Sequence, residues 1–406
     1  MPARRLLTIL VLAAASCGEL KPPIDAPVRA DDEAPAAGPG ALVPFLSAAA
    51  DGTVWMSWME QSPDSVWMLR VAHRPVTGGW SAPRLVVRDS LLFANWADFP
   101  SVVVDARGRL VAHFLRRSAP GKYSYHAWVT TSSDSGATWS APQRLHSDTS
   151  ASEHGFAALV PQGDGTTFAA WLDGHATGSE QGAMSLGFGV LDSTLRVQRD
   201  TMLDTRTCDC CQVAGARTSG GAIFAYRDRS EGEVRDIAVV RYEDGRWVPP
   251  AIVHADGWVT KACPVNGPAL SARDRGVALA WFTNAGDSPK VQLVFSADRG
   301  ATWTPPIRVD DGAPIGRVDV EYLLDGHALV TWMERAGVGR VEIRARRIAR
   351  DGARSTAIVV GTTSDTRPSG FPRLVFAKEQ GVYVAWREMT SPTTLRLTRL
   401  QVPGSR

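Results

Sequence analysis

A sevenfold repeat constrains the fold of this chain more than any other feature of its sequence. Each copy has a Gly-containing turn, then a short apolar run that ends in an aromatic and a polar residue. The glycines are Gly52, Gly108, Gly165, Gly220, Gly276, Gly326 and Gly381, and the aromatic residues are Trp58, Phe114, Trp171, Tyr226, Trp281, Trp332 and Trp386, spaced 51 to 57 positions apart. Another apolar run precedes each turn, and glycine readily adopts the positive φ of tight turns, so each unit is predicted to open with a β-hairpin.

A second pattern, Ser-x-Asp-x-Gly-x-Thr-Trp, occurs twice in phase with the repeat. Its residues are Ser132, Asp134, Gly136, Thr138 and Trp139 in the first copy and Ser296, Asp298, Gly300, Thr302 and Trp303 in the second. Short polar side chains at this spacing cap a tight turn through hydrogen bonds to the backbone. The pattern resembles the Asp box of sialidase-like propellers, and the resemblance implies a structural role away from any active site.

Units of about 55 residues with four short strands each are typical of blades arranged around an axis. We therefore predict an all-β propeller over residues 41–406, with seven four-stranded blades; six blades, as in sialidases, are the alternative. The last unit has no evident fourth strand after Val402. Residues 22–28 loosely resemble the strand expected at 305–309 and could close the ring, although a tether is the favoured interpretation.

The N-terminus has the features of an export signal. Arg4 and Arg5 precede an apolar run over residues 6–15, which is too short to span a bilayer core of about 30 Å. Small residues before Cys17 resemble the bacterial lipobox. The resemblance implies that residues 1–16 are a signal peptide and that Cys17 carries a lipid; an ordinary secretory signal is the alternative.

The residues after the cysteine predict a location and a linker. Gly18 stands where an Asp commonly retains lipoproteins in the inner membrane, so the resemblance implies the outer membrane of a bacterial cell envelope. Residues 17–40 are rich in Pro, Ala and Asp without periodicity, and are predicted to be a flexible tether. The chain has 44 Lys and Arg against 42 Asp and Glu, and this balance argues against a nucleic-acid partner.

The propeller geometry predicts which residues meet. The innermost strand of every blade runs the same way, so the segments that enter it and the loops that leave the second strand gather at one rim, around a funnel. Candidate acid/base carboxylates there are Asp98, Glu153 and Asp319. Candidate ligand-binding residues are Arg116, His154, Arg227, Asp228, Arg229, Asn266, Arg317 and Glu334. Three of these, Arg116, Arg227 and Arg317, could form an anion clamp, because a guanidinium binds a carboxylate bidentately.

Four cysteines fall on the same predicted rim. Cys208, Cys210 and Cys211 share one loop, and Cys263 enters the neighbouring blade. In an oxidising compartment two disulfides are expected, with three possible connectivities that include a vicinal Cys210–Cys211 bond. The alternatives are free thiols or a thiolate site for Cu or Zn, with His154 as a further ligand.

From about residue 95 to 340 the chain resembles a group of bacterial lipoproteins usually labelled exo-α-sialidase. The stretches that carry the resemblance are residues 153–156, 208–211, 226–230, 233–237, 263–268 and 316–320. Sialidases grip the substrate with three arginines, attack with a Tyr activated by a Glu and use an Asp as acid/base. The chain departs from that pattern, because residues 42–45 lack the family's opening Arg-Ile-Pro and only Tyr123 and Tyr125 fall in a candidate rim loop.

Three functions from different classes follow from these observations. The first is a monomeric, lipid-anchored propeller whose funnel binds an anionic or glycan ligand or a partner protein. The second is a sialidase-type glycoside hydrolase with a rearranged site. The third is a metal-binding or redox lipoprotein built on the cysteines. The sequence has no Gly-rich phosphate loop, nucleophile elbow or dinucleotide fingerprint that would indicate another enzyme class.

Overall fold

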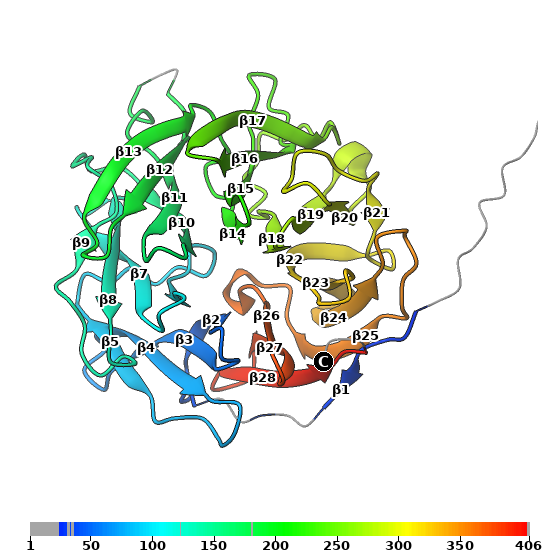
Figure 1. Ribbon diagram of the computed structural model, residues 1–406, viewed down its shortest axis with the longest axis horizontal. Helices are drawn as coiled ribbons and strands as arrows, with labels where there is room; N and C mark the ends of the chain where they lie inside the picture. Colours follow the sequence, from blue (N-terminus) through cyan, green and yellow to red (C-terminus); the bar gives the residue numbers. More distant parts are fainter. Residues whose placement is uncertain (1–23, 31–32, 34–35, 122, 180–181, 404–406) are drawn as a thin grey trace, which may run out of the picture.

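The computed structural model describes residues 24–30, 33, 36–121, 123–179 and 182–403; the predicted signal peptide and Cys17 lie outside these residues. The strands form seven four-stranded antiparallel sheets arranged as a ring (Figure 1). The prediction of an all-β propeller with seven blades is therefore confirmed, and the six-bladed alternative is wrong. Two short 3-10 helices, η1 (Ala285–Asp287) and η2 (Arg367–Ser369), accompany the strands. None of the described helices is long and apolar enough to cross a membrane.

The blades follow one another along the chain, and the first strand of each blade lies nearest the axis (Figure 1). Blades one and two contain β2 (Leu42–Ala48), β3 (Val54–Gln61), β4 (Trp67–Arg74) and β5 (Arg84–Arg88), then β6 (Ser101–Val104), β7 (Leu110–Arg117), β8 (Tyr125–Ser132) and β9 (Gln143–Arg144). Blades three and four contain β10 (His154–Pro161), β11 (Thr167–Asp173), β12 (Ser185–Leu191) and β13 (Val197–Asp204), then β14 (Ala214–Thr218), β15 (Gly221–Arg227), β16 (Ile237–Glu243) and β17 (Arg246–His254).

The remaining blades repeat this order. Blades five and six contain β18 (Ala269–Arg273), β19 (Gly276–Thr283), β20 (Lys290–Ser296) and β21 (Ile307–Arg308), then β22 (Pro314–Tyr322), β23 (Ala328–Gly337), β24 (Arg340–Ile348) and β25 (Ile358–Thr363). Blade seven contains β26 (Arg373–Ala377), β27 (Gly381–Glu388), β28 (Thr394–Gln401) and β1 (Val28–Arg29).

The N-terminal strand β1 closes the ring. It pairs antiparallel with β28, with Val28 opposite Gln401 and Arg29 opposite Leu400. The fourth strand that the last unit lacks is thus supplied from the other end of the chain (Figure 1). The expectation of a tether over residues 17–40 is corrected at β1, and the propeller begins before residue 41. Joining the ends of the chain covers the end of the β28 edge that would otherwise be open.

The aromatic residues of the repeat lie on the second strand of each blade and form its core. All seven are 5% exposed or less. A buried indole N–H needs an acceptor, and three of the tryptophans find one two residues further on. Trp58 donates to Glu60 (2.8 Å), Trp171 to Asp173 (2.9 Å) and Trp332 to Glu334 (2.7 Å). The acidic residues that leave these second strands therefore hold core tryptophans.

Both Asp boxes adopt the expected capped turn. The Ser132 hydroxyl accepts the Gly136 N–H (2.8 Å), and the Asp134 carboxylate accepts the backbone N–H of Thr138 (2.9 Å). The second box repeats these bonds between the equivalent atoms, with the same distances. The two Asp boxes therefore stabilise turns, as their resemblance to those of sialidase-like propellers implies.

Candidate functional site

The three arginines of the predicted anion clamp are held in separate places. Arg116 forms an ion pair with Asp89 (2.8 Å). Arg227 is 1% exposed, and its guanidinium donates to three backbone carbonyl oxygens. Arg317 donates to the hydroxyl of Ser369 (2.7 Å) and to two backbone carbonyl oxygens. Each of the three guanidinium groups is thus already engaged within the protein, Arg116 by a carboxylate and the other two mainly by backbone carbonyl oxygens.

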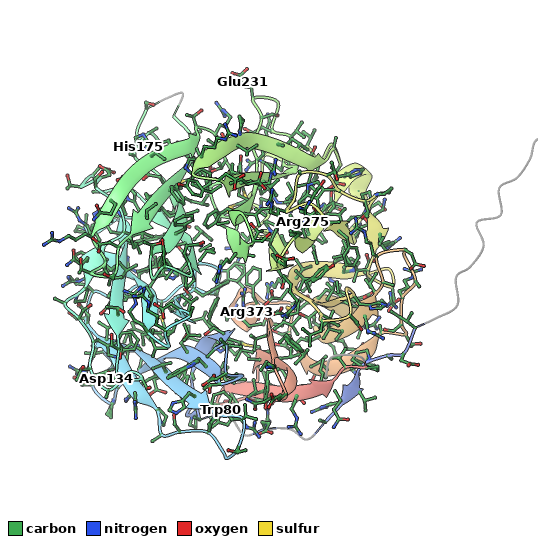
Figure 2. All side chains as sticks on the ribbon, viewed as in Figure 1. Trp80, Asp134, His175, Glu231, Arg275 and Arg373 are labelled. Carbon is green, nitrogen blue, oxygen red and sulfur yellow. A yellow bond between two sulfur atoms is a disulfide. The ribbon has the colours of Figure 1, made fainter. Side chains whose placement is uncertain are left out.

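Three other predicted residues fasten one blade to the next. Asp98, Asn266 and Asp319 each accept a backbone N–H from the innermost strand of the following blade, over 2.7, 2.7 and 2.9 Å. The donors are Phe156, Arg317 and Leu374. Asp319 also lies 3.3 Å from Arg373, beside a cavity of about 100 Å³. Figure 2 places Arg373 near the axis, and the Asp319 carboxylate is engaged by Arg373 and by the Leu374 N–H.

The four cysteines form two disulfides, Cys208–Cys211 and Cys210–Cys263. The prediction of two disulfides is confirmed, and the vicinal connectivity is wrong. The second bond joins the entry of blade four to the entry of blade five. In this state none of the four offers a thiolate to a metal.

The remaining predicted rim residues also have internal roles. Arg229 forms ion pairs with Asp209 (3.0 Å) and Glu233 (2.8 Å). Burial raises the pKa of the Asp228 carboxyl above its usual value. Glu334 accepts the Trp332 indole and two backbone N–H groups.

A groove of about 590 Å³ opens at the junction of blades two, three and four. Two carboxylates, Glu153 and Asp209, and the half-exposed imidazole of His175 line it, together with hydroxyl groups and the exposed ring of Tyr123. The other lining residues are Ser124, Ser150, Ala151, Ser152, Gly174, Thr177, Gly178 and Met184. Its described lining contains no Lys or Arg. Figure 2 shows His175 toward the outside of the ring, so this groove, called the rim groove below, lies away from the axial funnel.

A larger hollow of about 730 Å³ lies elsewhere, lined by the closing strand β1 and by residues of β25, β27 and β28. None of the residues predicted for the site lines it. The rim groove is therefore the candidate functional site, because it contains Glu153 from the predicted rim and Asp209, which lies between the predicted rim residues Cys208 and Cys210.

Behind the rim groove, one tyrosine joins two of the predicted carboxylates. The Tyr125 hydroxyl donates to Asp98 (3.0 Å) and makes a short hydrogen bond with Glu153. The hydroxyl has a single proton, so one carboxyl group must itself be protonated to satisfy both contacts. Burial raises the pKa of Asp98 to about 8 and that of Glu153 to about 7, and the charge of Asp209 adds to the shift of Glu153.

The packing around Tyr125 decides what it can do. Its side chain is 0% exposed. A Cβ at Gly155 would collide with both Asp98 and the Tyr125 ring, so only glycine fits there. Burial also raises the pKa of the Tyr125 hydroxyl well above its usual value. Tyr125 is thus out of reach of a ligand in the rim groove, and the tyrosine nucleophile of the sialidase mechanism has no counterpart at this position.

Histidine and carboxylate side chains continue from the rim groove into the blade. His175 lies 2.6 Å from one oxygen of Asp173, and the same oxygen lies 3.5 Å from Nε2 of the buried His154. His154 Nε2 is also 2.9 Å from Asp148. The predicted ligand residue His154 is therefore behind the groove wall and not in it.

Sequence reasoning missed the histidines around this point. His126 and His146 are 6% and 3% exposed and pack against His154. Burial lowers the pKa of His126 to about 4 and that of His146 to about 3, so both rings are neutral. A signal was present, because four of the eight histidines fall within residues 126–175. Without the strand register, nothing in the sequence placed them on one blade junction.

Comparisons with known proteins identify the architecture. The sequence matches no protein-family model and no curated protein. Among solved structures the chain is similar to the BP39L lectin from Burkholderia pseudomallei, with 14% identity, a TM-score of 0.60 and coverage of 89% of this chain and 97% of the lectin. A protein of unknown function from Dyadobacter fermentans has 14% identity and a TM-score of 0.53, covering 93% of this chain and 100% of that one. An ulvan lyase of polysaccharide lyase family PL25 has 11% identity and a TM-score of 0.52, covering 94% and 97%.

The sialidase resemblance is met only in part. Solved structures similar to this chain include the Hadza microbial sialidase Hz136, at 17% identity and a TM-score of 0.44, over 72% of this chain and 63% of that one. A likeness at this level carries no site or activity over to this chain. The separated arginines and the buried Tyr125 give no support to a sialidase site.

Proposed function

We propose that this chain is a lipid-anchored propeller of the bacterial cell envelope that binds a neutral glycan in the rim groove. The observation that carries the proposal is the lining of that groove, in which hydroxyl groups, two carboxylates and an imidazole surround an exposed tyrosine ring. Carboxylates accept hydrogen bonds from sugar hydroxyls, and an amphipathic aromatic ring packs against the apolar face of a sugar. Pockets of several hundred Å³ with a few convergent polar groups are typical ligand sites.

The charges favour a neutral ligand over an anionic one. The described groove lining offers Glu153 and Asp209 and no cationic Lys or Arg. The nearby guanidinium of Arg229 is already engaged by Asp209 and Glu233. An anionic sugar would face the carboxylate of Asp209 and the partly ionised carboxyl group of Glu153, with no cationic side chain in the described lining. A neutral sugar therefore fits this described lining better than an anionic one.

The envelope location rests on separate support. Two disulfides agree with an oxidising compartment outside the cytoplasm. Lipid attachment at Cys17 remains a prediction from the lipobox. Metabolic labelling with a palmitate analogue tests it, since the wild type should incorporate the label and Cys17→Ala should not. Release of the unlabelled wild type into the medium would instead indicate an ordinary secretory signal.

A second candidate function, glycoside hydrolysis, is favoured by one observation. Burial raises the pKa of Glu153 to about 7, so the carboxyl group at the groove wall can hold a proton near neutral pH and act as a general acid. Asp209 lines the same groove as an exposed carboxylate and could serve as the base. We favour binding over hydrolysis, because the Glu153 carboxyl group is already hydrogen-bonded to the buried Tyr125.

A glycan array followed by calorimetry with the best oligosaccharide tests both functions. Under the binding proposal, Asp209→Asn and His175→Ala should each weaken binding by at least about tenfold, since each removes a hydrogen-bonding group from the groove. Glu231→Gln changes an exposed acid that does not line the groove, and it should bind as the wild type does. No bound neutral glycan, or binding unaffected by either groove variant, would refute the proposal.

The same samples separate binding from catalysis. Mass spectrometry of the bound oligosaccharide after prolonged incubation should find it intact if the groove only binds. Cleavage by the wild type that is lost in Glu153→Gln and retained in Glu231→Gln would establish the hydrolase instead.

A further inference from the structure

Three buried histidines converge where blade two meets blade three. His126 lies on β8, His146 follows β9, and His154 begins β10. They are 6%, 3% and 0% exposed. One ring nitrogen from each lies within 4.8 Å of the others. The imidazoles come from three separate segments, so their meeting is produced by the fold and not by local sequence.

Hydrogen bonding within the protein does not account for His146. Neither ring nitrogen of His146 has a hydrogen-bond partner among the described residues. The His146 and His154 rings stack face to face, with centroids 3.9 Å apart and planes 8° apart. Buried polar atoms are almost always hydrogen-bonded, and burying one without a partner is costly. An imidazole with two unpartnered nitrogens in the protein interior therefore requires an explanation.

One distance is that of two ligands on one ion, and the other ring nitrogens lie within 4.8 Å. The His146 ring, which stacks parallel to His154, must turn about its side-chain bonds to direct a nitrogen at the same point. Nδ1 of His126 lies 3.3 Å from Nδ1 of His154. Two nitrogens bound to one tetrahedral zinc at about 2.0 to 2.1 Å are about 3.3 to 3.4 Å apart. Three neutral imidazoles are a common ligand set for such an ion, which then keeps a fourth position for water.

The other side of His154 supplies the support that a ligand histidine usually has. Its Nε2 lies 2.9 Å from Asp148 and 3.5 Å from Asp173. Metal-bound histidines commonly direct their second ring nitrogen at a carboxylate, which orients the ring. Asp173 also accepts the Trp171 indole and contacts His175, so it is held in place by the blade core. The two carboxylates thus face Nε2 of His154, whereas His126 faces the other ring nitrogen, Nδ1.

We propose that His126, His146 and His154 bind one divalent transition-metal ion, of which zinc is the best match to the nitrogen ligands and the tetrahedral spacing. The ion joins β8 of blade two to β10 of blade three, and it fixes the segment between β9 and β10. That segment supplies Ser150, Ala151, Ser152 and Glu153 to the rim groove. The metal is thus expected to hold one wall of the groove in shape, without touching a ligand there.

The site is distinct from the metal site considered at the cysteines. The histidines offer nitrogen ligands only, and the cysteines are paired in disulfides. The proposal also stands apart from the glycan proposal, because metal content and thermal stability are measured without any sugar.

The test uses the oxidised, full chain after treatment with a chelator and dialysis. Titration with zinc chloride, followed by calorimetry and elemental analysis, should find one zinc per chain with sub-micromolar affinity. Cobalt in place of zinc should give the visible absorption of a four-coordinate site with nitrogen ligands. Zinc should raise the unfolding temperature and the chelator should lower it.

Variants locate the ion. His146→Ala removes a ring that makes no hydrogen bond within the described chain, and it should weaken zinc binding by at least about tenfold. His254→Ala removes a half-exposed histidine of blade four and should leave binding unchanged. If the His146 variant is unfolded, the wild-type measurements decide alone. No stoichiometric zinc together with no shift in unfolding temperature would overturn the proposal, as would a folded His146→Ala protein that binds zinc like the wild type.

Discussion

The two disulfides should differ strongly in their contribution to stability. Cys210–Cys263 closes a loop with a sequence separation of 53, whereas Cys208–Cys211 closes one with a separation of 3. If a crosslink acts by reducing the entropy of the unfolded chain, the loss on removal is about 4 kcal/mol for the long loop and about 1.6 kcal/mol for the short one. For a chain of this size the unfolding entropy is about 0.8 kcal/mol per kelvin, so the unfolding temperatures should fall by about 5 °C and about 2 °C.

The paired variants Cys210→Ala with Cys263→Ala, and Cys208→Ala with Cys211→Ala, provide the comparison. Each removes one crosslink and two sulfur atoms, and each leaves the other disulfide intact. Cys208 and Cys211 are both 1% exposed, so loss of packing acts against the predicted order and makes the test stricter. Thermal unfolding followed by circular dichroism, with a urea titration in parallel, measures both. Equal losses, or a larger loss for the short loop, would refute the entropic reasoning.

Three further changes test the contacts behind the rim groove and in the Asp boxes. Burial raises the pKa of Asp98 to about 8, so folding favours its protonated form, and wild-type stability should fall as pH rises from about 4 to 8. Urea titrations at several pH values should show a flatter pH dependence of stability for Asp98→Asn, and an unchanged pH dependence would contradict this prediction. Ser296→Ala removes the acceptor of the buried Gly300 N–H and should cost about 1 to 3 kcal/mol; a neutral effect would argue against the capped turn as a stabilising element. Gly155→Ala should destabilise the folded protein by at least about 2 kcal/mol through overpacking, whereas Gly79→Ala, whose Cβ would meet open space, should change stability little. Similar shifts in unfolding temperature for the two variants would contradict the steric role of Gly155.

The fold was predictable because one signal recurred along the chain. Turn glycines and buried aromatic residues at a spacing of 51 to 57 specify both the hairpins and the number of blades. Ring closure was harder to predict, since β1 is only two residues long and pairs with a strand at the opposite end of the chain. Local sequence carries little information about a contact of that length, and two residues show no periodicity.

For the candidate site, the sequence predicted which segments lie close together but not which side chains face a ligand. The propeller geometry correctly predicted that Asp98 lies close to Glu153 and that the four cysteines lie together. It did not distinguish side chains that face solvent from those that face a neighbouring blade. Arg227 is the clearest case, because its sequence context indicates a charged loop residue while its guanidinium is enclosed by carbonyl oxygens. The direction of a side chain depends on register and bulges, which the repeat spacing does not determine.

The sequence separation of a contact between blades shows which places of the repeat it joins. Hydrogen bonds that fasten one blade to the next join equivalent places in consecutive repeats, so Asp98, Gln212, Asn266 and Asp319 reach partners 58, 55, 51 and 55 residues away. These separations match the repeat, as expected of contacts that every blade junction needs. The contacts of Tyr125 with Glu153 and of His126 with His154 span 28 residues, about half a repeat.

Contacts at about half a repeat also join other neighbouring blades, since Tyr226 bonds to Asp204, Trp281 to Asp256 and Thr363 to Arg387, over 22, 25 and 24 residues. The junction of blades two and three differs in the groups that meet there, because a tyrosine shared by two carboxyl groups and three buried histidines lie behind the rim groove. Its chemistry, and not the spacing of its contacts, marks this junction as the specialised part of the molecule. Substitutions at two junctions check this difference. Substitutions at Asn266 should reduce stability alone, whereas substitutions at His154 should alter metal content and glycan affinity in addition to stability.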